Sequence, residues 1–276
     1  MITISAFADE IGADLKVQMD SCEASGIHCI DVRGIDGVNV SKMTLDQVSR
    51  YKKQMDDRGF SVPCIGSPIG KIRMDEDFGA HLDVLRHCCE VARVFGTSMI
   101  RVFSFYASQG ADIAHERDAV MERMAAMVEA AGEADVTLLH ENERAIYGAR
   151  PDTVKDLFAT IRSDRFQCLF DPANFVDEGI APYDEGWNAG LADLTTYFHV
   201  KDRVPHAPTC VPAGQGAGQF EEIFTDLARR GWSGTMTLEP HMQAAGQFAG
   251  FTGPELFVKA VNALKGLCDR HGITYK

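Results

Sequence analysis

The sequence lacks the paired cysteine spacing of a disulfide framework or a redox motif, because none of its eight cysteines forms a Cys-x-x-Cys pair. Several stand inside apolar runs instead, such as Cys29 in HCIDV and Cys168 in FQCLF. Such positions are typical of buried, reduced thiols, which persist in the cytosol. We therefore expect a cytoplasmic protein.

Basic charge is also scarce, with 27 Lys and Arg against 40 Asp and Glu and a formal net charge of −13. An acidic chain repels phosphate backbones, so we expect no nucleic-acid partner. The first residues, MITISAFADEIGADL, lack the basic and apolar regions of a signal peptide. No apolar run reaches the length of a membrane span, so no membrane partner is expected either.

Nucleotide-binding signatures are missing too. No GxGxxG follows the first apolar run, and GxxxxGK[ST] does not occur. No low-complexity segment or linker divides the 276 residues, of which 45% are hydrophobic. We therefore expect residues 1–276 to form a single domain with a sizeable core.

Short apolar runs, rich in β-branched and aromatic residues, alternate with segments of helical period. The predicted strands are ITISAF (2–7), HCIDVR (28–33), SVPCIG (61–66), SMIRVFSF (98–105), VTLLHE (136–141), QCLFD (167–171), TYFHVK (196–201) and TMTLEP (235–240). Strands that alternate with helices imply parallel strands with crossover helices. The pattern predicts an α/β protein, a (β/α)₈ TIM barrel, with an open doubly wound sheet as the alternative.

Four successive predicted strands carry acid or imidazole side chains at their carboxyl ends, where TIM barrels place their active sites. These side chains are Glu141, Asp171, His199 and Glu239. Each alone fits a solvated strand end or a helix cap, but together they converge on one point. Three carboxylates and one imidazole favour a hard divalent ion, Mn²⁺ or Mg²⁺, with Co²⁺ or Zn²⁺ as alternatives.

Other polar residues fall near the same predicted barrel mouth. Residues two apart on a strand face the same side, so Glu143 accompanies Glu141, Lys201 accompanies His199, and His241 accompanies Glu239. The expected substrate-binding residues are Lys201, His241, Lys71, Arg101, Glu143 and Asn174. For Lys201, a salt bridge with Glu143 or Asp202 stays open as the alternative. Arg101 and Arg33 could likewise contact substrate or form an internal salt bridge.

Phe7, Phe103 and Phe105 are candidates for an apolar wall. The loop VPAGQGAGQF (211–220) could present its backbone N–H groups to a phosphate or a carboxylate, and its glycines fit a tight turn equally well.

The motifs HENE (140–143), FDPANF (170–175), HVKD (199–202) and LEPH (238–241) occur in this order. On these motifs the sequence resembles the xylose-isomerase-like TIM barrels, the sugar phosphate isomerase/epimerase group, over nearly the whole chain. The resemblance implies one divalent metal ion, Mn²⁺ first, held by the four strand-end ligands. In the ketose 3-epimerase branch, the glutamates that match Glu141 and Glu239 also act as acid and base. Two positions depart from that branch: Asn174 stands where a His is usual, and Lys201 and Asp202 stand where it carries an Arg.

The expected function is a metal-dependent sugar isomerase or epimerase that acts on a small hydroxy-ketone or aldose through an enediolate. Glu141 and Glu239 are the first candidates for catalytic acid and base, with Glu143 and His241 as alternatives. A dehydratase or lyase acting on a keto-inositol or keto-sugar is the alternative. A non-catalytic sugar-binding barrel is a rival of another class. A nuclease of the endonuclease IV type needs more histidines than the strand ends supply. The resemblance leaves a homo-oligomer open.

Overall fold

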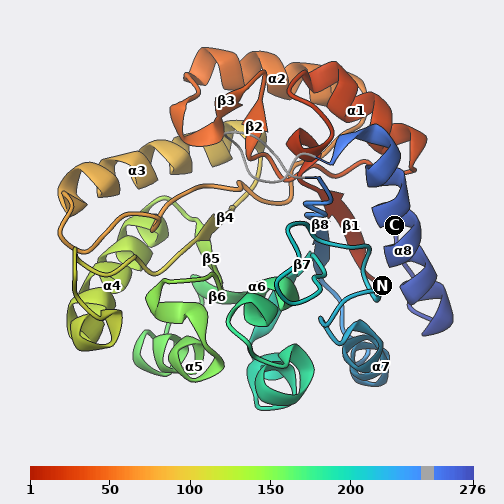
Figure 1. The fold of residues 1–276 in the computed structure, drawn as a ribbon. Helices are drawn as coiled ribbons and strands as arrows, with labels where there is room; N and C mark the ends of the chain where they lie inside the picture. The colour runs from red at the N-terminus through yellow and green to blue at the C-terminus, as the bar shows by residue number, and fades with distance from the viewer. Residues whose placement is uncertain (244–251) are drawn as a thin grey trace.

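The computed structural model describes residues 1–243 and 252–276. Its centre is a parallel sheet of six strands in the order β1-β8-β7-β6-β5-β4, and helices surround it (Figure 1). The strands are β1 (Thr3–Ala6), β4 (Met99–Val102), β5 (Thr137–Glu141), β6 (Phe166–Phe170), β7 (Thr195–Val200) and β8 (Thr235–Leu238). The helices are α1 (Leu15–Ala24), α2 (Leu45–Asp57), α3 (Phe78–Phe95), α4 (Arg117–Glu133), α5 (Pro151–Thr160), α6 (Pro172–Asp177), α7 (Phe220–Arg230) and α8 (Gly253–Arg270). The predicted TIM barrel is confirmed.

Two of the expected strands, 28–33 and 61–66, are wrong as continuous strands. They are extended segments joined to their neighbours by isolated parallel bridges, which pair Ala6 with Ile30, Cys29 with Ser61, Val32 with Ile65, and Ile65 with Ile100. Pro63 lies between the bridging residues and has no N–H to donate to a ladder. The bridges still run from β1 to β4, so they complete the ring of strands.

A short hairpin follows the segment 28–33 and was not among the predicted elements. Strands β2 (Gly34–Ile35) and β3 (Val38–Asn39) pair in antiparallel fashion around Asp36 and Gly37, whose φ angles are 53° and 74°. An Asp-Gly pair with both φ angles positive is the preferred two-residue hairpin connection. The hairpin carries Asn39 to the mouth of the barrel, where it lines the pocket described below.

The chain ends close the barrel beside β1. The Ile4 N–H donates to the Lys276 carbonyl at 2.9 Å, and Ile2 bridges Tyr275. Figure 1 shows the two termini next to each other beside α8. Among the helices of the described residues, none is long and apolar enough to cross a membrane.

The strand predicted over 98–105 ends early, at Val102. Phe105 has a φ of 67°, which turns the chain away from the strand direction. Its ring packs edge-on against Phe78 of α3, with the ring centroids 6.0 Å apart. The expectation that Phe105 belongs to an apolar wall at the site is therefore wrong.

The segment 66–72 lies directly on the residues that follow β4. The Phe103 N–H donates to the Ile69 carbonyl at 2.8 Å, and the Phe105 N–H donates to the Gly70 carbonyl at 3.0 Å. Gly70 has a φ of 90°, and a Cβ there would lie 2.0 Å from the Phe103 carbonyl oxygen. Only glycine allows this approach, and the approach fixes the position of Lys71 at the barrel mouth.

We predict that Gly70→Ala lowers the free energy of unfolding by about 3 kcal/mol or more, because the methyl group would collide with backbone that cannot move aside. Gly110→Ala is the matched control, since Gly110 has a φ of 78° and nothing within 4 Å of a Cβ. That change should cost about 1 kcal/mol, from backbone strain alone. Urea unfolding measures both, and equal losses would contradict the close packing at Gly70.

Candidate metal centre

Four side chains from successive strands meet at the carboxyl end of the barrel. Glu141 ends β5, Asp171 follows β6, His199 lies in β7 and Glu239 follows β8. All four are buried, and their ligand atoms lie within 4.8 Å of one another. His199 Nδ1 is 3.3 Å from both Glu141 Oε1 and Glu239 Oε2, and 3.8 Å from Asp171 Oδ2. The structure thus brings together the four side chains that the strand ends single out.

The charges of this cluster are strongly coupled. Burial raises the pKa of the Glu141 carboxyl, but His199 and Arg101 outweigh burial and bring that pKa well below its usual range. Burial likewise opposes ionisation of Glu239, yet Lys201 and His241 hold its pKa well below the ordinary value. For Asp171 burial dominates, so its pKa is raised although Lys201 lowers it. Two of the three carboxyls are therefore held as carboxylates by neighbouring cations.

Several polar atoms of the cluster are buried and incompletely satisfied. Glu141 Oε2, Asp171 Oδ2 and both ring nitrogens of His199 have no well-formed hydrogen bond within the described part of the chain. Three of these atoms have ion-pair partners at 2.8 to 3.8 Å, and His199 Nε2 has no partner of either kind among the described residues. Buried polar atoms almost always have a partner, so His199 Nε2 in particular can accept one. Three carboxylates and one imidazole form a donor set that suits Mn²⁺, Mg²⁺ or a similar divalent ion. The residues present fit a metal ion.

A second ring of cationic side chains surrounds the four ligands. Lys201 Nζ lies 2.8 Å from Asp171 Oδ2 and 3.3 Å from Glu239 Oε2. Arg101 Nη1 lies 3.2 Å from Glu141 Oε2, and His241 Nε2 lies 3.2 Å from Glu239 Oε1. Lys201, Arg101 and His241 therefore pair with the candidate ligands. For Lys201 the partners are Asp171 and Glu239, rather than Glu143 or Asp202 as the sequence analysis considered.

Arg33, for which the sequence left a substrate contact or an internal salt bridge open, belongs to this ring as a salt-bridge partner. Its guanidinium contacts three carboxylates: Asp9 Oδ2 at 2.8 Å, Glu10 Oε1 at 2.7 Å and Glu239 Oε1 at 2.9 Å. The buried Glu10 also lies 3.0 Å from His241 Nε2. The signal available in the sequence was the position of Arg33 at the end of the segment 28–33, next to the barrel mouth.

Two amide side chains fix the carboxylates in place. Asn142 exchanges two hydrogen bonds with the Asp171 backbone, at 2.9 and 2.8 Å. Asn174 Nδ2 donates to Glu141 Oε1 at 3.1 Å and to the Asn142 carbonyl at 2.8 Å. Asp171 Oδ1 accepts from the Asn174 N–H and so caps the first turn of α6. Asn174 thus touches a candidate ligand directly.

A cavity of about 360 Å³ opens above the cluster, and 13 of its 15 lining residues have polar or charged side chains. The residues that line it are Arg33, Asn39, Gly66, Pro68, Lys71, Arg101, Glu141, Glu143, Arg144, Asn174, Asp177, Lys201, Arg203, Glu239 and His241. Glu141 and Glu239 face this cavity, whereas Asp171 and His199 lie behind its wall. Two of the four candidate ligands can therefore reach a bound molecule as well as an ion.

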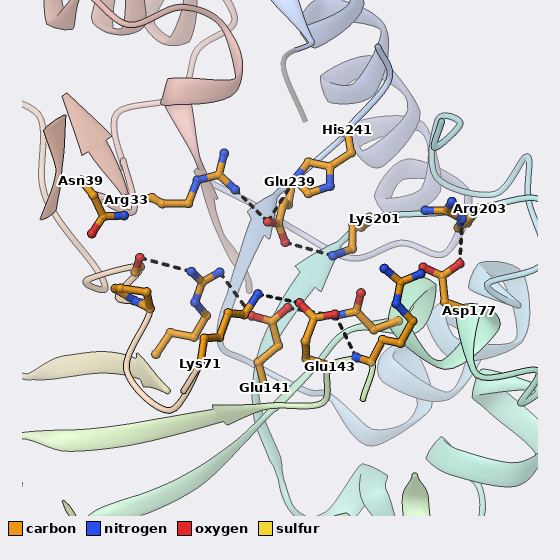
Figure 2. A pocket seen from close by; sticks show the side chains of 15 residues that line it. Arg33, Asn39, Lys71, Glu141, Glu143, Asp177, Lys201, Arg203, Glu239 and His241 are labelled. Atoms are coloured by element: carbon orange, nitrogen blue, oxygen red, sulfur yellow. Dashed lines mark hydrogen bonds and ion pairs between the residues drawn. The ribbon is translucent and has the colours of Figure 1, made fainter. Parts of the chain in front are cut away.

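Figure 2 shows the ion pairs around the cavity. Lys71 Nζ lies 2.8 Å from Glu143 Oε2, and Arg203 Nε lies 2.7 Å from Asp177 Oδ1. The Lys71 ammonium also stands 4.2 Å from the centre of the Phe103 ring. Lys71 and Glu143 thus occupy the wall as a pair rather than as independent groups.

The glycine-rich loop before α7 does not offer its backbone to a phosphate. Asp202 Oδ2 accepts from the N–H groups of Gly214 and Gly216, both at 2.8 Å, and Asp202 Oδ1 accepts from Gly218 at 2.9 Å. A Cβ at Gly216 would lie 2.4 Å from Asp202 Oδ1, so the glycine allows the close approach. The glycines therefore form a tight turn around a buried carboxylate, and the alternative interpretation of these residues as a phosphate-binding loop is wrong.

The fold and the site can be compared with known proteins. A D-tagatose 3-epimerase-like protein has a TM-score of 0.78 and 14% identity over 98% of each chain. The probable 3-DHS dehydratase AsbF from Bacillus anthracis has a TM-score of 0.75 and 14% identity over 96% of this chain and 99% of that chain. A xylose isomerase-like TIM barrel protein from Mycobacterium smegmatis, in complex with magnesium, has a TM-score of 0.73 and 14% identity over 99% of this chain and 97% of that chain.

At such low identity these structures are evidence of a common fold. No curated protein matches the chain in sequence. The model of one family, the xylose isomerase-like TIM barrels, matches residues 19–267. That match spans most of the chain, including all four candidate ligands, and the protein therefore belongs to the xylose isomerase-like TIM barrel family.

Proposed function

We propose that this protein is a divalent-metal-dependent sugar isomerase or epimerase that acts on a hydroxy-ketone or aldose. The proposal is supported by the placement of the four candidate ligands, of which two face the cavity and two do not. Glu141 and Glu239 face both the metal-ligand cluster and the cavity, while Asp171 and His199 face the cluster from behind. Two carboxylates at the boundary between an ion and a substrate are suited to proton transfer.

The metal would be held by Glu141, Asp171, His199 and Glu239. When bound, a divalent ion supplies Lewis-acid polarisation of a carbonyl and stabilises the negative charge of an enediolate. Mn²⁺ is our first choice, with Mg²⁺, Co²⁺ or Zn²⁺ as alternatives, because the ligand set is mostly carboxylate. Burial of the cluster keeps bulk water from competing for these interactions.

The protein's own groups supply the proton transfers. A carboxylate at Glu141 or Glu239 takes a proton from the carbon beside the substrate carbonyl, and the other glutamate returns one from the opposite side. Return to the same carbon inverts it, and return to the neighbouring carbon exchanges aldose for ketose. Lys201, Arg101, His241 and Asn174 contact the two glutamates and reach the cavity, so they orient the substrate hydroxyls.

Elimination of water is the second candidate function. Lys201 Nζ and His241 Nε2 lie 3.3 and 3.2 Å from the oxygens of Glu239, and both side chains reach the cavity. Burial lowers the pKa of His241, but Glu239 and Glu10 raise it to about 9, so the imidazolium is the prevailing form at neutral pH. A cation in that place could protonate a departing hydroxyl. Product mass separates the two functions, since elimination removes one water and isomerisation removes nothing.

For the metal, we predict that the wild-type chain binds one Mn²⁺ and that Asp171→Asn weakens this binding by about 100-fold or more, beyond the usual effect of outer-shell changes. Asparagine is also a good N-cap, so the start of α6 should stay intact. Calorimetric titration after chelator treatment measures the affinity. Asp177→Asn is the control, because Asp177 lines the cavity outside the cluster. Unchanged Mn²⁺ affinity in Asp171→Asn would refute the assigned site.

For the acid and base, we predict that Glu141→Gln and Glu239→Gln each slow the uptake of solvent deuterium into a hydroxy-ketone sugar by about 1,000-fold. Glutamine keeps the size of the side chain and an oxygen ligand but cannot carry the proton. The exchange is followed by NMR with Mn²⁺ at a saturating concentration for each variant. Asp177→Asn is the control, since Asp177 lines the cavity but pairs with Arg203. Equal exchange in all three variants would exclude the assigned acid and base.

A further inference from the structure

Glu10 is a buried carboxylate that the proposed reaction does not use. It ends the short helix η1 (Ala8–Glu10), which directly follows β1, and its side chain is fully buried. It stands behind the cavity wall rather than in it. Burial of a carboxylate is costly unless the group is paired and hydrogen-bonded. The contacts of Glu10 therefore indicate what this chain gains from it.

The contacts of Glu10 lead to the candidate ligand Glu239. Glu10 Oε1 lies 2.7 Å from Arg33 Nη2 and 3.0 Å from His241 Nε2. The same two side chains lie 2.9 and 3.2 Å from Glu239 Oε1, and Figure 2 shows both of them directed at that carboxylate. Arg33 and His241 therefore each stand between a candidate ligand and a carboxylate outside the ligand set.

Glu10 also holds the backbone that follows β8. Its Oε2 accepts from the His241 N–H at 3.3 Å and from the Thr252 hydroxyl at 2.9 Å, and its carbonyl accepts from the Thr252 N–H at 2.7 Å. His241 has a φ of 42°, a left-handed conformation that is unfavourable for a residue with a Cβ. Glu10 thus fixes both the ring and the backbone of the residue two positions after Glu239.

The charges around the cluster show why a further carboxylate is needed. Each of the three carboxylates in the ligand set faces a full cation: Arg101 at Glu141, Lys201 at Asp171 and Arg33 at Glu239. Equal numbers of cations and carboxylates leave little negative potential for a divalent ion. Asp9 and Glu10 alter this balance, because both also pair with Arg33. Three carboxylates share the charge of Arg33, so the candidate ligands keep a net negative charge.

We propose that Glu10 is a positioning residue of the metal centre: it takes up part of the charge of Arg33 and so keeps Glu239 available to a metal ion. This inference rests on the proposed function, which assigns a divalent ion to the four ligands. Without the charge of Glu10, Arg33 would bear more strongly on Glu239 and would repel the ion. Groups that contact metal ligands from outside commonly change metal affinity by about 10- to 100-fold.

The test measures the Mn²⁺ affinity of the full-length chain by calorimetric titration after chelator treatment. Glu10→Gln keeps the size of the side chain but removes its charge, and we expect it to weaken Mn²⁺ binding about tenfold or more. Asp9→Asn is the matched control, because Asp9 pairs with Arg33 but does not contact His241 or Thr252. It should weaken binding by about threefold or less, since Arg33 retains two carboxylate partners.

A second change, Arg33→Gln, separates a role of the charge from a role in packing. If Glu10 acts by neutralising Arg33, Glu10→Gln should cost about threefold or less in Mn²⁺ affinity once Arg33→Gln is present. A role in packing alone predicts the same cost in both backgrounds. Urea unfolding of the metal-free chains shows whether each variant is folded.

Arg33→Gln alone keeps the proposal testable if Glu10→Gln does not fold. It should leave Mn²⁺ binding as tight as in the wild type or tighter, because it removes a cation from Glu239. Weaker binding in that variant, wild-type affinity in Glu10→Gln, or an undiminished loss beside Arg33→Gln would each overturn the inference. In these cases the wild-type chain still binds Mn²⁺, so the proposed function stands. A wild-type chain that takes up no Mn²⁺ would instead reject the metal centre itself, and this inference with it.

Discussion

The repulsion among three buried carboxylates is the constraint on which the rest of the site depends. Glu141, Asp171 and Glu239 are each at most 3% exposed, and their oxygens lie within 4.8 Å of one another. Buried like charges at this separation cannot all stay ionised without compensation. Arg101, Lys201 and the imidazole of His199 supply positive charge in the structure described. A divalent ion would supply it more compactly, at the point where the carboxylates converge.

The barrel brings the candidate ligands together, and amide side chains fix the orientation of their carboxylates. Parallel strands deliver their carboxyl ends to one edge, so the chain needs one polar residue at each strand end to assemble a site. Strand ends alone leave a carboxylate free to rotate. Asn142 and Asn174 remove that freedom by linking the Asp171 backbone to Glu141, and Asp171 gains a further bond as the cap of α6. Asn174 therefore has a positioning task in this chain, where the epimerase branch usually has a histidine.

The sequence predicted the parts of this arrangement that obey local rules. Alternation of strands and helices predicted the barrel, and the two-residue parity of a strand predicted that His199 and Lys201 share a face. It did not predict that Arg33 pairs with Glu239, because these residues are 206 positions apart and meet only when the barrel closes. It also left open whether the glycines before α7 form a tight turn or a phosphate-binding loop, since their spacing fits both. The interrupted segments 28–33 and 61–66 have apolar patterns like those of true strands, and Pro63 was the one local signal against them.

The surroundings of Glu141 and Glu239 make these two glutamates unequal, and this bears on their roles in the proposed reaction. His199 lies 3.3 Å from both glutamates. Glu239 is also contacted by Arg33, Lys201 and His241, at 2.9, 3.3 and 3.2 Å, whereas Glu141 is also contacted by Arg101 alone, at 3.2 Å, among the described residues. More cations around a carboxylate stabilise its charge and make it a weaker base. On the proposed function Glu141 is then the better base for the first proton. Glu239, with a protonated His241 beside it, is better placed on the side from which a proton returns to the substrate.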